Sequence, residues 1–416
     1  MSKLVIHGGK SLKGEISLQG SKNAALPILA ATVLINGVSV IHNCPNLSDI
    51  TAAIKILKHL GCVVKRDNKT IIIDSTNIIN HNIPDLLMRE MRSSIIFLGS
   101  IIARTNKANM CSPGGCELGP RPIDIHIFAL KALGVNIDDN GGSLNCETNG
   151  FLSGTEITLP LPSVGATENA IIAATVAKGK TIIRNAAREP EIADLIDFLN
   201  KAGAKIYYQD GYIEIEGVSS LKGATHTVIP DRIVASTYMS AVAITGGELL
   251  LKNVNTKHLI PVLDCFKQSG CEIKYEQDLL YLSAPKRLKS IDTVKTHYYP
   301  GFPTDSAPTT LAMLTVAQGT SIFIENIFEN RFKYIDELKR MGAKVNSHGK
   351  VAVVKGVKNL WGSSVECTDL RGGAALIVAA LSAKGKTEIS KLCHIERGYE
   401  DIEFNLKKLG ANIKRM

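Results

Sequence analysis

The sequence contains few aromatic residues and no long apolar segment. Aromatic residues make up 5% of the 416 residues, with a single tryptophan, whereas nucleic-acid-binding surfaces combine clustered basic side chains with aromatic ones. No apolar run approaches the ~18–20 residues that a membrane-spanning helix needs, and the N-terminal MSKLVIHGGKSLKG has no apolar signal region. We therefore expect no nucleic-acid partner and no membrane insertion.

The nine cysteines lack any paired spacing. There is no C-x-x-C motif and no cysteine–histidine cluster with zinc spacing, which favours reduced thiols in the cytoplasm and no metal site. Free cysteines usually lie in apolar cores, and we predict this for Cys62, Cys271 and Cys393.

Basic residues outnumber acidic ones, giving a formal charge of +9. Such a surplus suits anionic ligands, and because the basic residues are dispersed we favour small phosphorylated substrates over nucleic acid. A surplus that is only solvated surface is the alternative. The length suggests two or three domains at roughly 100–200 residues each.

An internal repeat is the strongest architectural signal. The segments LKHLGCVVKRDNKTIII, LKALGVNIDDNGGSLNC, LNKAGAKIYYQDGYIEI, FKQSGCEIKYEQDLLYL and LKRMGAKVNSHGKVAVV share a helix end, a glycine, and two strands, and LKKLGANIKRM begins a sixth copy. The glycines, Gly61, Gly134, Gly203, Gly270, Gly342 and Gly410, fit left-handed helix C-caps. Alanine-rich segments such as ENAIIAATVAKGKTIIRN repeat upstream. We predict an α/β fold of six units, three per domain, with small-residue helices inside and sheets outside.

Helix-start loops that depart from the repeat are the candidate functional sites. SPGGCELGPRP, residues 112–122, places Cys116 and Arg121 among glycines and prolines, and a thiol close to Lys22, Arg92 and Arg121 would have a lowered pKa. The alternative is a surface loop with an idle thiol. Lys22 and Asn23 open a helix whose N-terminus favours anions, although a solvated lysine in a helix-cap region fits equally.

The later loops carry a carboxylate and several arginines. Asp305, in YPGFPTDSAP, is either a helix N-cap or a general base. Arg331, Asp369, Arg371 and Arg397 lie in further helix-start loops, where several arginines suit a multiply charged anion. Surface salt bridging is the alternative for each arginine alone. We expect these loops to face a cleft between the two domains.

Together these motifs resemble the enolpyruvyl transferases, in particular the branch of peptidoglycan synthesis. GSKNAALPILAA, MRSSI, PGGCELGPRPIDIHI, PSVGATENA, NAAREPEI, PDRI, FPTD, FENRF, TDLR and HIERGYE occur in the family's order, whereas the shikimate-pathway members lack the cysteine loop and SKNAALP. The resemblance implies a two-domain inside-out α/β barrel. Its domains are residues 21–229, and residues 1–20 with 230–416.

The resemblance also implies the reaction. Phosphoenolpyruvate would donate its enolpyruvyl group to the 3-hydroxyl of UDP-N-acetylglucosamine, releasing phosphate by addition and elimination through a tetrahedral ketal. These two small molecules are the expected partners, with no metal or organic cofactor, and the oligomeric state stays open. Cys116 would be the proton donor, the covalent nucleophile that epoxide antibiotics alkylate, or both.

The remaining roles follow the same motifs. Asp305 would act at the sugar hydroxyl, and Lys22, Arg121 and Arg397, with Asn23 beside them, would clamp phosphate and carboxylate. Nucleotide-sugar contacts would come from Arg92, Arg121, Pro122, Ile123, Asp124, Ile125 and Ile327, and diphosphate contacts from Ser163, Val164 and Gly165. Asp231, Asp369, Arg371, Arg331 and Glu189 would support the cleft.

Three features depart from the family pattern. Pro308 falls one turn into the expected helix, glycines follow TDLR, and Leu161 replaces a lysine of some relatives. We expect these to affect substrate affinity more than reaction type. An inactive paralogue is the main rival, but it predicts loss of Lys22, Cys116, Asp305 or Arg397, and all four are present.

Overall fold

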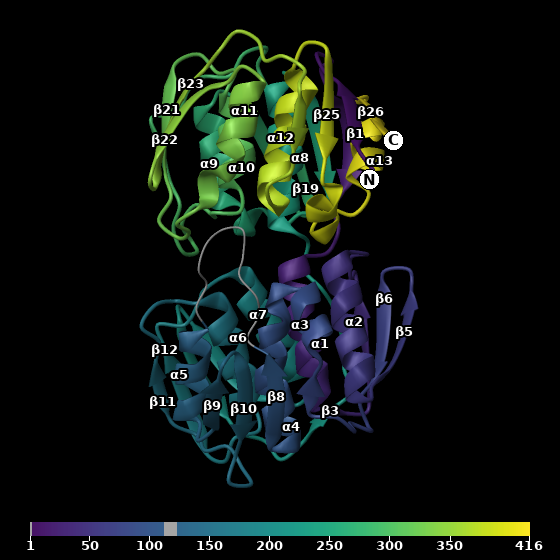
Figure 1. The fold of residues 1–416 in the computed structure, drawn as a ribbon, viewed down its shortest axis with the longest axis vertical. Coiled ribbons are helices and arrows are strands. Elements are labelled where there is room, and N and C mark those ends of the chain that lie inside the picture. The colour runs from purple at the N-terminus through teal and green to yellow at the C-terminus, as the bar shows by residue number, and fades with distance from the viewer. Residues whose placement is uncertain (1, 112–122) are drawn as a thin grey trace. The chain divides into compact units, whose positions relative to one another are not determined.

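The computed structural model describes residues 2–111 and 123–416 (Figure 1). Their contacts divide the chain into two compact units. One unit combines the residues up to Gln19 with Pro230–Met416, and the other contains the described residues from Gly20 to Ile229. Among the described residues, no helix has the length and apolar character needed to cross a bilayer.

Each unit contains three four-stranded sheets of one design. A short edge strand runs parallel to its neighbour, and that neighbour pairs antiparallel with one strand of a two-stranded antiparallel pair. In the unit from Gly20 to Ile229 the sheet orders are β16-β4-β6-β5, β7-β8-β10-β9 and β11-β12-β14-β13, with a separate parallel pair β15-β3. The strands are β3 (Ile35–Asn36), β4 (Val38–His42), β5 (Val63–Asp67), β6 (Thr70–Asp74), β7 (Asn82–Ile83), β8 (Lys107–Cys111), β9 (Asn136–Asn140), β10 (Ser143–Glu147), β11 (Glu156–Thr158), β12 (Lys180–Arg184), β13 (Lys205–Gln209), β14 (Tyr212–Glu216), β15 (Leu221–Lys222) and β16 (Thr225–Thr227).

The other unit repeats the design with strands from both ends of the chain. Its sheet orders are β18-β19-β17-β2, β20-β21-β23-β22 and β24-β25-β1-β26. The strands are β1 (Leu4–His7), β2 (Lys13–Ser17), β17 (Glu248–Lys252), β18 (Glu272–Glu276), β19 (Leu279–Ser283), β20 (Thr293–Lys295), β21 (Thr320–Ile324), β22 (Lys344–His348), β23 (Val351–Lys355), β24 (Ser364–Glu366), β25 (Lys386–Ser390) and β26 (Asn412–Arg415). β1 pairs antiparallel with both β25 and β26. It supplies the strand that the sixth sequence copy lacks.

The alanine-rich helices form the interior of each unit, as the sequence predicts. Nearly all of their residues are buried, because small side chains let helices and sheets approach closely and leave no polar face. In one unit they are α1 (Lys22–Ala31) and α6 (Val164–Ala174), and in the other α8 (Arg232–Ile244), α10 (Ala307–Leu314) and α12 (Leu370–Ser382) (Figure 1). The first of these units also contains α4 (Phe97–Thr105), which has a single alanine and is buried over residues 97–102.

Six of the remaining α-helices end just before the repeated glycines, and α3 ends before Met91. They are α2 (Ser48–Leu60), α3 (Asp85–Glu90), α5 (Asp124–Ala132), α7 (Pro190–Lys201), α9 (Ile260–Gln268), α11 (Ile335–Arg340) and α13 (Ile402–Lys408), with short 3₁₀ helices η1 (Thr32–Leu34), η2 (Arg92–Ile96), η3 (Thr256–His258), η4 (Arg331–Tyr334) and η5 (Leu392–Arg397). All six repeat glycines have positive φ, between 88° and 110°. The predicted left-handed termini are therefore confirmed.

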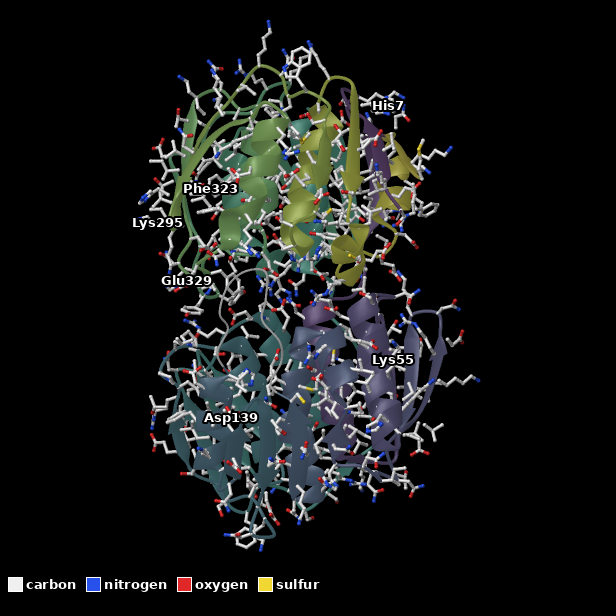
Figure 2. The ribbon with its side chains drawn as sticks, in the orientation of Figure 1. His7, Lys55, Asp139, Lys295, Phe323 and Glu329 are labelled. Atoms are coloured by element: carbon white, nitrogen blue, oxygen red, sulfur yellow. The ribbon has the colours of Figure 1, made fainter. Side chains whose placement is uncertain are left out.

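Strand side chains alternate between core and surface. Phe323 of β21 is buried, whereas Lys295 of the neighbouring β20 is exposed (Figure 2). Cys62 and Cys271 are buried as predicted, and burial raises the pKa of Cys271 to about 11. The core prediction for Cys393 is wrong: this residue is exposed, because β25 ends at Ser390 and η5 turns Leu392 and Ile395 to the core instead.

Candidate functional site

Lys22 opens α1 as a buried ion pair. Its Nζ lies 3.0 Å from Asp49 Oδ2, and the two side chains are 10% and 2% exposed. Ser21 caps the helix by accepting a hydrogen bond from the N–H of Ala24. The solvated-lysine alternative is therefore wrong. Asp49, in the first turn of α2, was not predicted, because 26 residues separate it from Lys22 and no local motif marks the pair. Asn23, the second residue of α1, is half-buried.

The predicted diphosphate segment forms the N-terminus of α6. Ser163 is the N-cap and accepts from the N–H of Ala166, with Val164 and Gly165 as the first helical residues. Gly165 has no room for a side chain, because a Cβ there would lie 2.9 Å from His126 Cε1. His126 is buried, and its Nδ1 lies 2.8 Å from Asn169 Nδ2. The backbone N–H groups at the N-terminus of α6 could therefore contact an anion such as the diphosphate.

The other predicted residues of this unit lie around α5 and η2. Ile123 precedes α5, Asp124 is its first residue and is exposed, and Ile125 follows. Arg92 begins η2. Cys116, Arg121 and Pro122 lie outside the described residues, so their predicted roles stay predictions.

Asp305 lies between two buried arginines. Arg331 Nη2 is 2.7 Å from Asp305 Oδ1, and Arg371 contacts Oδ2 with Nη2 at 3.0 Å and Nε at 3.1 Å. The arginine side chains are 1% and 4% exposed, whereas that of Asp305 is 28% exposed. The surface-salt-bridge alternative is therefore wrong for Arg331 and Arg371. The two guanidinium groups fix the orientation of the carboxylate.

The helix-capping alternative for Asp305 is also wrong. The N-cap of α10 is Ser306, which makes no side-chain capping hydrogen bond. The carboxylate of Asp305 instead pairs with the two arginines. Pro308 is the second residue of α10, not one turn inside it, and in the first helical turn proline removes no intrahelical hydrogen bond.

Buried polar groups extend the arrangement around Arg371. Its Nη1 donates to the Tyr399 hydroxyl at 3.3 Å, and that hydroxyl lies 2.8 Å from Thr237 Oγ1. Burial opposes the charge of Arg371, but Asp305, Tyr399 and Asp231 raise its pKa overall. Arg371 is therefore a permanent cation held in place from both sides.

The other predicted acidic residues are placed at helix starts. Asp231 caps α8 by accepting from the N–H groups of Ile233 and Val234, and Asp369 caps α12 by accepting from Arg371 and Gly372. Glu189 directly precedes α7. The predicted roles of these three as cleft residues stay predictions. So do the nucleotide-sugar contact predicted for Ile327, which follows β21, and the phosphate and carboxylate contact predicted for Arg397, the last residue of η5.

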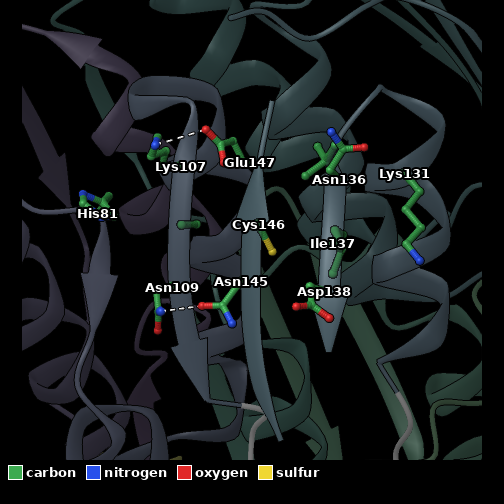
Figure 3. A pocket seen from close by; sticks show the side chains of 12 residues that line it. His81, Lys107, Asn109, Lys131, Asn136, Ile137, Asp138, Asn145, Cys146 and Glu147 are labelled. Carbon is green, nitrogen blue, oxygen red and sulfur yellow. Dashed lines mark hydrogen bonds and ion pairs between the residues drawn. The ribbon is translucent and has the colours of Figure 1, made fainter. Parts of the chain in front are cut away.

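A hollow of about 700 Å³ lies on the sheet β7-β8-β10-β9 (Figure 3). Lys107 pairs with Glu147 at 3.1 Å, and Asn109 Nδ2 donates to Asn145 Oδ1. None of the predicted site residues lines it. Within residues 2–111 and 123–416, no group of three or more His, Cys, Asp or Glu side chains is placed to hold a metal ion.

Comparison with known proteins places the chain in a family. The family model for EPSP synthase (3-phosphoshikimate 1-carboxyvinyltransferase) matches residues 6–406. The chain belongs to the EPSP synthase family. The family resemblance seen in the motifs is therefore confirmed.

Curated members of this family with close similarity carry a narrower name. The chain is 50% identical to UDP-N-acetylglucosamine 1-carboxyvinyltransferase 2 of Caldanaerobacter subterraneus subsp. tengcongensis, with 100% of both proteins covered. It is 47% identical to UDP-N-acetylglucosamine 1-carboxyvinyltransferase 1 of Symbiobacterium thermophilum, over 100% of this chain and 95% of that protein.

Solved structures support the fold. The enolpyruvyl transferase NikO from Streptomyces tendae has a TM-score of 0.91 at 23% identity, covering 100% of this chain and 99% of that one. EPSP synthase from Acinetobacter baumannii has a TM-score of 0.79 at 17% identity, with both chains fully covered. The predicted α/β fold of the enolpyruvyl transferases is confirmed.

Proposed function

We propose that the chain transfers the enolpyruvyl group of phosphoenolpyruvate to the 3-hydroxyl of UDP-N-acetylglucosamine and releases phosphate, the first committed step of peptidoglycan synthesis. The proposal depends on the 50% identity, over the full length, to a relative named UDP-N-acetylglucosamine 1-carboxyvinyltransferase 2. Both substrates are small anionic molecules, which suits the net charge of +9.

Asp305 is suited to the acceptor hydroxyl. Each carboxylate oxygen already accepts from one arginine, but a carboxylate has about four lone-pair sites, so it can also accept a hydrogen bond from the sugar 3-hydroxyl. The fixed carboxylate would orient that hydroxyl for attack and take its proton as the new bond forms.

Lys22 is suited to the phosphate or carboxylate of phosphoenolpyruvate. Asp49 balances its charge and fixes its ammonium group, so Lys22 offers oriented N–H donors at the start of α1. Arg121 and Arg397 would add bidentate donors to the same anion, and Asn23 a further amide. Their charge would stabilise the charge that develops in the transition state.

The chemistry then proceeds in two balanced steps. The sugar oxygen forms a bond to C2 of phosphoenolpyruvate while C3 gains a proton, which gives the tetrahedral ketal. Loss of a proton from C3 and of phosphate from C2 restores the double bond. We assign proton donation to C3, and the alternative covalent adduct at C2, to the Cys116 thiol, since a thiol with a pKa near the working pH can serve both roles.

The location follows from the thiol chemistry. No disulfide bond joins any of the eight described cysteines, which fits a reducing compartment. We infer that the enzyme acts in the cytoplasm.

Phosphate release tests the proposal. The protein should release phosphate only when phosphoenolpyruvate and UDP-N-acetylglucosamine are both present. Release with 3-phosphoshikimate in place of the nucleotide sugar would point to the other branch of the family. No release from folded protein that binds both substrates would leave the inactive-paralogue alternative standing.

A further inference from the structure

Glu325 directly follows β21, a position at which three other units of the repeat have asparagine. Directly after β4, β12 and β17 the chain has Asn43, Asn185 and Asn253, all in the left-handed conformation with φ between 54° and 56°. Directly after β21 it has Glu325, which is not among the residues with positive φ. The unit that contains β21 therefore lacks the left-handed residue that follows the other three strands.

Backbone hydrogen bonds show how the β21 unit corresponds to the other three. In each unit the residue after the short edge strand donates its N–H to the carbonyl of the last residue of β4, β12, β17 or β21. The pairs are Val228 to His42, Leu159 to Arg184, Leu18 to Lys252 and Thr296 to Ile324. The asparagines then donate Nδ2 to the carbonyls of Val228, Leu159 and Leu18. In the β21 unit this bond is made one residue later, from Asn326 to Thr296 at 3.0 Å. The N–H of Glu325 donates to the Lys350 carbonyl at 2.8 Å, as those of Cys44, Ala186 and Val254 do to the residue before the next paired strand in their units. The backbone of Glu325 therefore keeps the pairing of the repeat, and only its side chain makes contacts that the other units lack.

The buried carboxylate of Glu325 joins two segments. It is 1% exposed. Its Oε1 accepts from the N–H groups of Ile327 and Phe328 at 2.8 and 3.0 Å, and its Oε2 accepts from the Thr304 hydroxyl at 2.9 Å. The same side chain thus holds the turn that contains Ile327 and the residue that precedes Asp305.

Arg331 also binds Thr304, at its carbonyl. Its Nε and Nη2 donate to the Thr304 carbonyl at 3.2 and 2.8 Å, and Nη2 also pairs with Asp305. Its guanidinium lies over the ring of Phe328. Thr304 is therefore held by Glu325 at its hydroxyl and by Arg331 at its carbonyl, which fixes the position from which Asp305 extends.

We infer that Glu325 is a positioning residue for the nucleotide-sugar acceptor: it couples the Ile327–Phe328 turn to the Asp305 loop through Thr304. This inference rests on the proposed function, in which Asp305 and Ile327 contact UDP-N-acetylglucosamine. Because Glu325 is covered, it acts through these groups and not by touching substrate.

Four variants test the coupling. Glu325→Ala removes all three hydrogen bonds, and Glu325→Gln keeps an oxygen for the two N–H groups while its amide can donate to the Thr304 hydroxyl. Thr304→Val removes only the link to Glu325. Thr296→Val is the matched control, because the Thr296 hydroxyl accepts from the N–H of Asn326 in the same turn and is not part of the links from Glu325 to Thr304. The backbone pairing of residue 296 with Phe302 is kept in this variant.

The measurements are the Kd for UDP-N-acetylglucosamine by calorimetry, the KM for each substrate, and the melting temperature. Loss of a buried hydrogen bond should weaken binding of the nucleotide sugar about tenfold in Glu325→Ala and several-fold in Thr304→Val. The KM for phosphoenolpyruvate should stay unchanged, and Glu325→Gln should recover most of the affinity. Thr296→Val should lower the melting temperature without changing the Kd.

Three results would overturn the inference: an unchanged Kd in Glu325→Ala and Thr304→Val, an equal rise of both KM values, or a Thr296→Val variant that weakens binding as much as Thr304→Val. Measurements on the wild-type protein distinguish failure of this inference from failure of the proposed function. Wild type that turns over with unaffected variants contradicts only the role of Glu325, whereas wild type that neither binds nor converts the nucleotide sugar contradicts both.

Discussion

Replacing Asp49 by asparagine removes the counter-charge of Lys22 while it preserves the size of the side chain. The pair is 3.0 Å apart and both side chains are nearly covered. Removing one partner of a buried ion pair costs about 3–5 kcal/mol, because the other charge is left uncompensated. For a domain of this size 1 kcal/mol shifts the melting temperature by about 2–4 °C, so Asp49→Asn and Lys22→Met should each lower it by roughly 6–20 °C.

The double variant Lys22→Met/Asp49→Leu separates stability from chemistry. Replacing a buried ion pair by apolar side chains of similar volume is often neutral or stabilising, so the melting temperature should return close to the wild-type value. Turnover should not return, because the ammonium group proposed to bind phosphoenolpyruvate is absent. Calorimetry and phosphate release measure the two properties. A double variant that turns over normally, or single variants that melt like the wild type, would refute this reasoning.

Three further predictions concern other parts of the chain. Asp305→Asn should lower turnover by about 100-fold or more while the exposed control Asp336→Asn keeps wild-type rates; equal rates in both, measured by phosphate release, would exclude a role for Asp305 at the hydroxyl. Burial, with Glu191 and Glu189 nearby, raises the pKa of Glu168 well above its usual 4.5. The folding free energy of the wild type should therefore become less favourable as the pH rises from 4.5 through the raised pKa, because the folded state must then bury a charged carboxylate. Glu168→Gln should lack this loss and be more stable than the wild type at pH 8 but not near pH 4, and urea unfolding across that range checks it; parallel curves would contradict it. Cys116→Ser should lose most turnover and no longer be alkylated by an epoxide inhibitor, as followed by mass spectrometry; continued alkylation would place the reactive thiol elsewhere.

Much of the fold could be predicted from sequence because its signals are local. A glycine after an amphipathic helix marks a left-handed terminus wherever it occurs, and Gly61 to Gly410 all behave alike. Runs of alanine and β-branched residues similarly mark the inner helices. The partner of β1 has no such signal, because four residues, Leu4–His7, carry no information about which sheet they join.

The site contacts escaped prediction because they depend on tertiary pairing. Asp305 and Arg371 are 66 residues apart and meet only in the folded unit, so a local pattern of aspartate before a helix misleadingly suggested a cap. Glu325 had a usable signal, since three units have asparagine directly after the corresponding strand, although Lys391 after β25 also departs from that pattern. Its link to Thr304 still required the structure.

Turnover in D₂O with both substrates tests the proposed reaction most directly. Addition and elimination make C3 a methyl group in the intermediate, so the product should be UDP-N-acetylglucosamine with an enolpyruvyl ether at the 3-oxygen and deuterium on its vinyl carbon, as seen by NMR. An ether without deuterium would contradict the ketal route, and an unmodified nucleotide sugar after incubation with folded protein would contradict the proposed transfer itself.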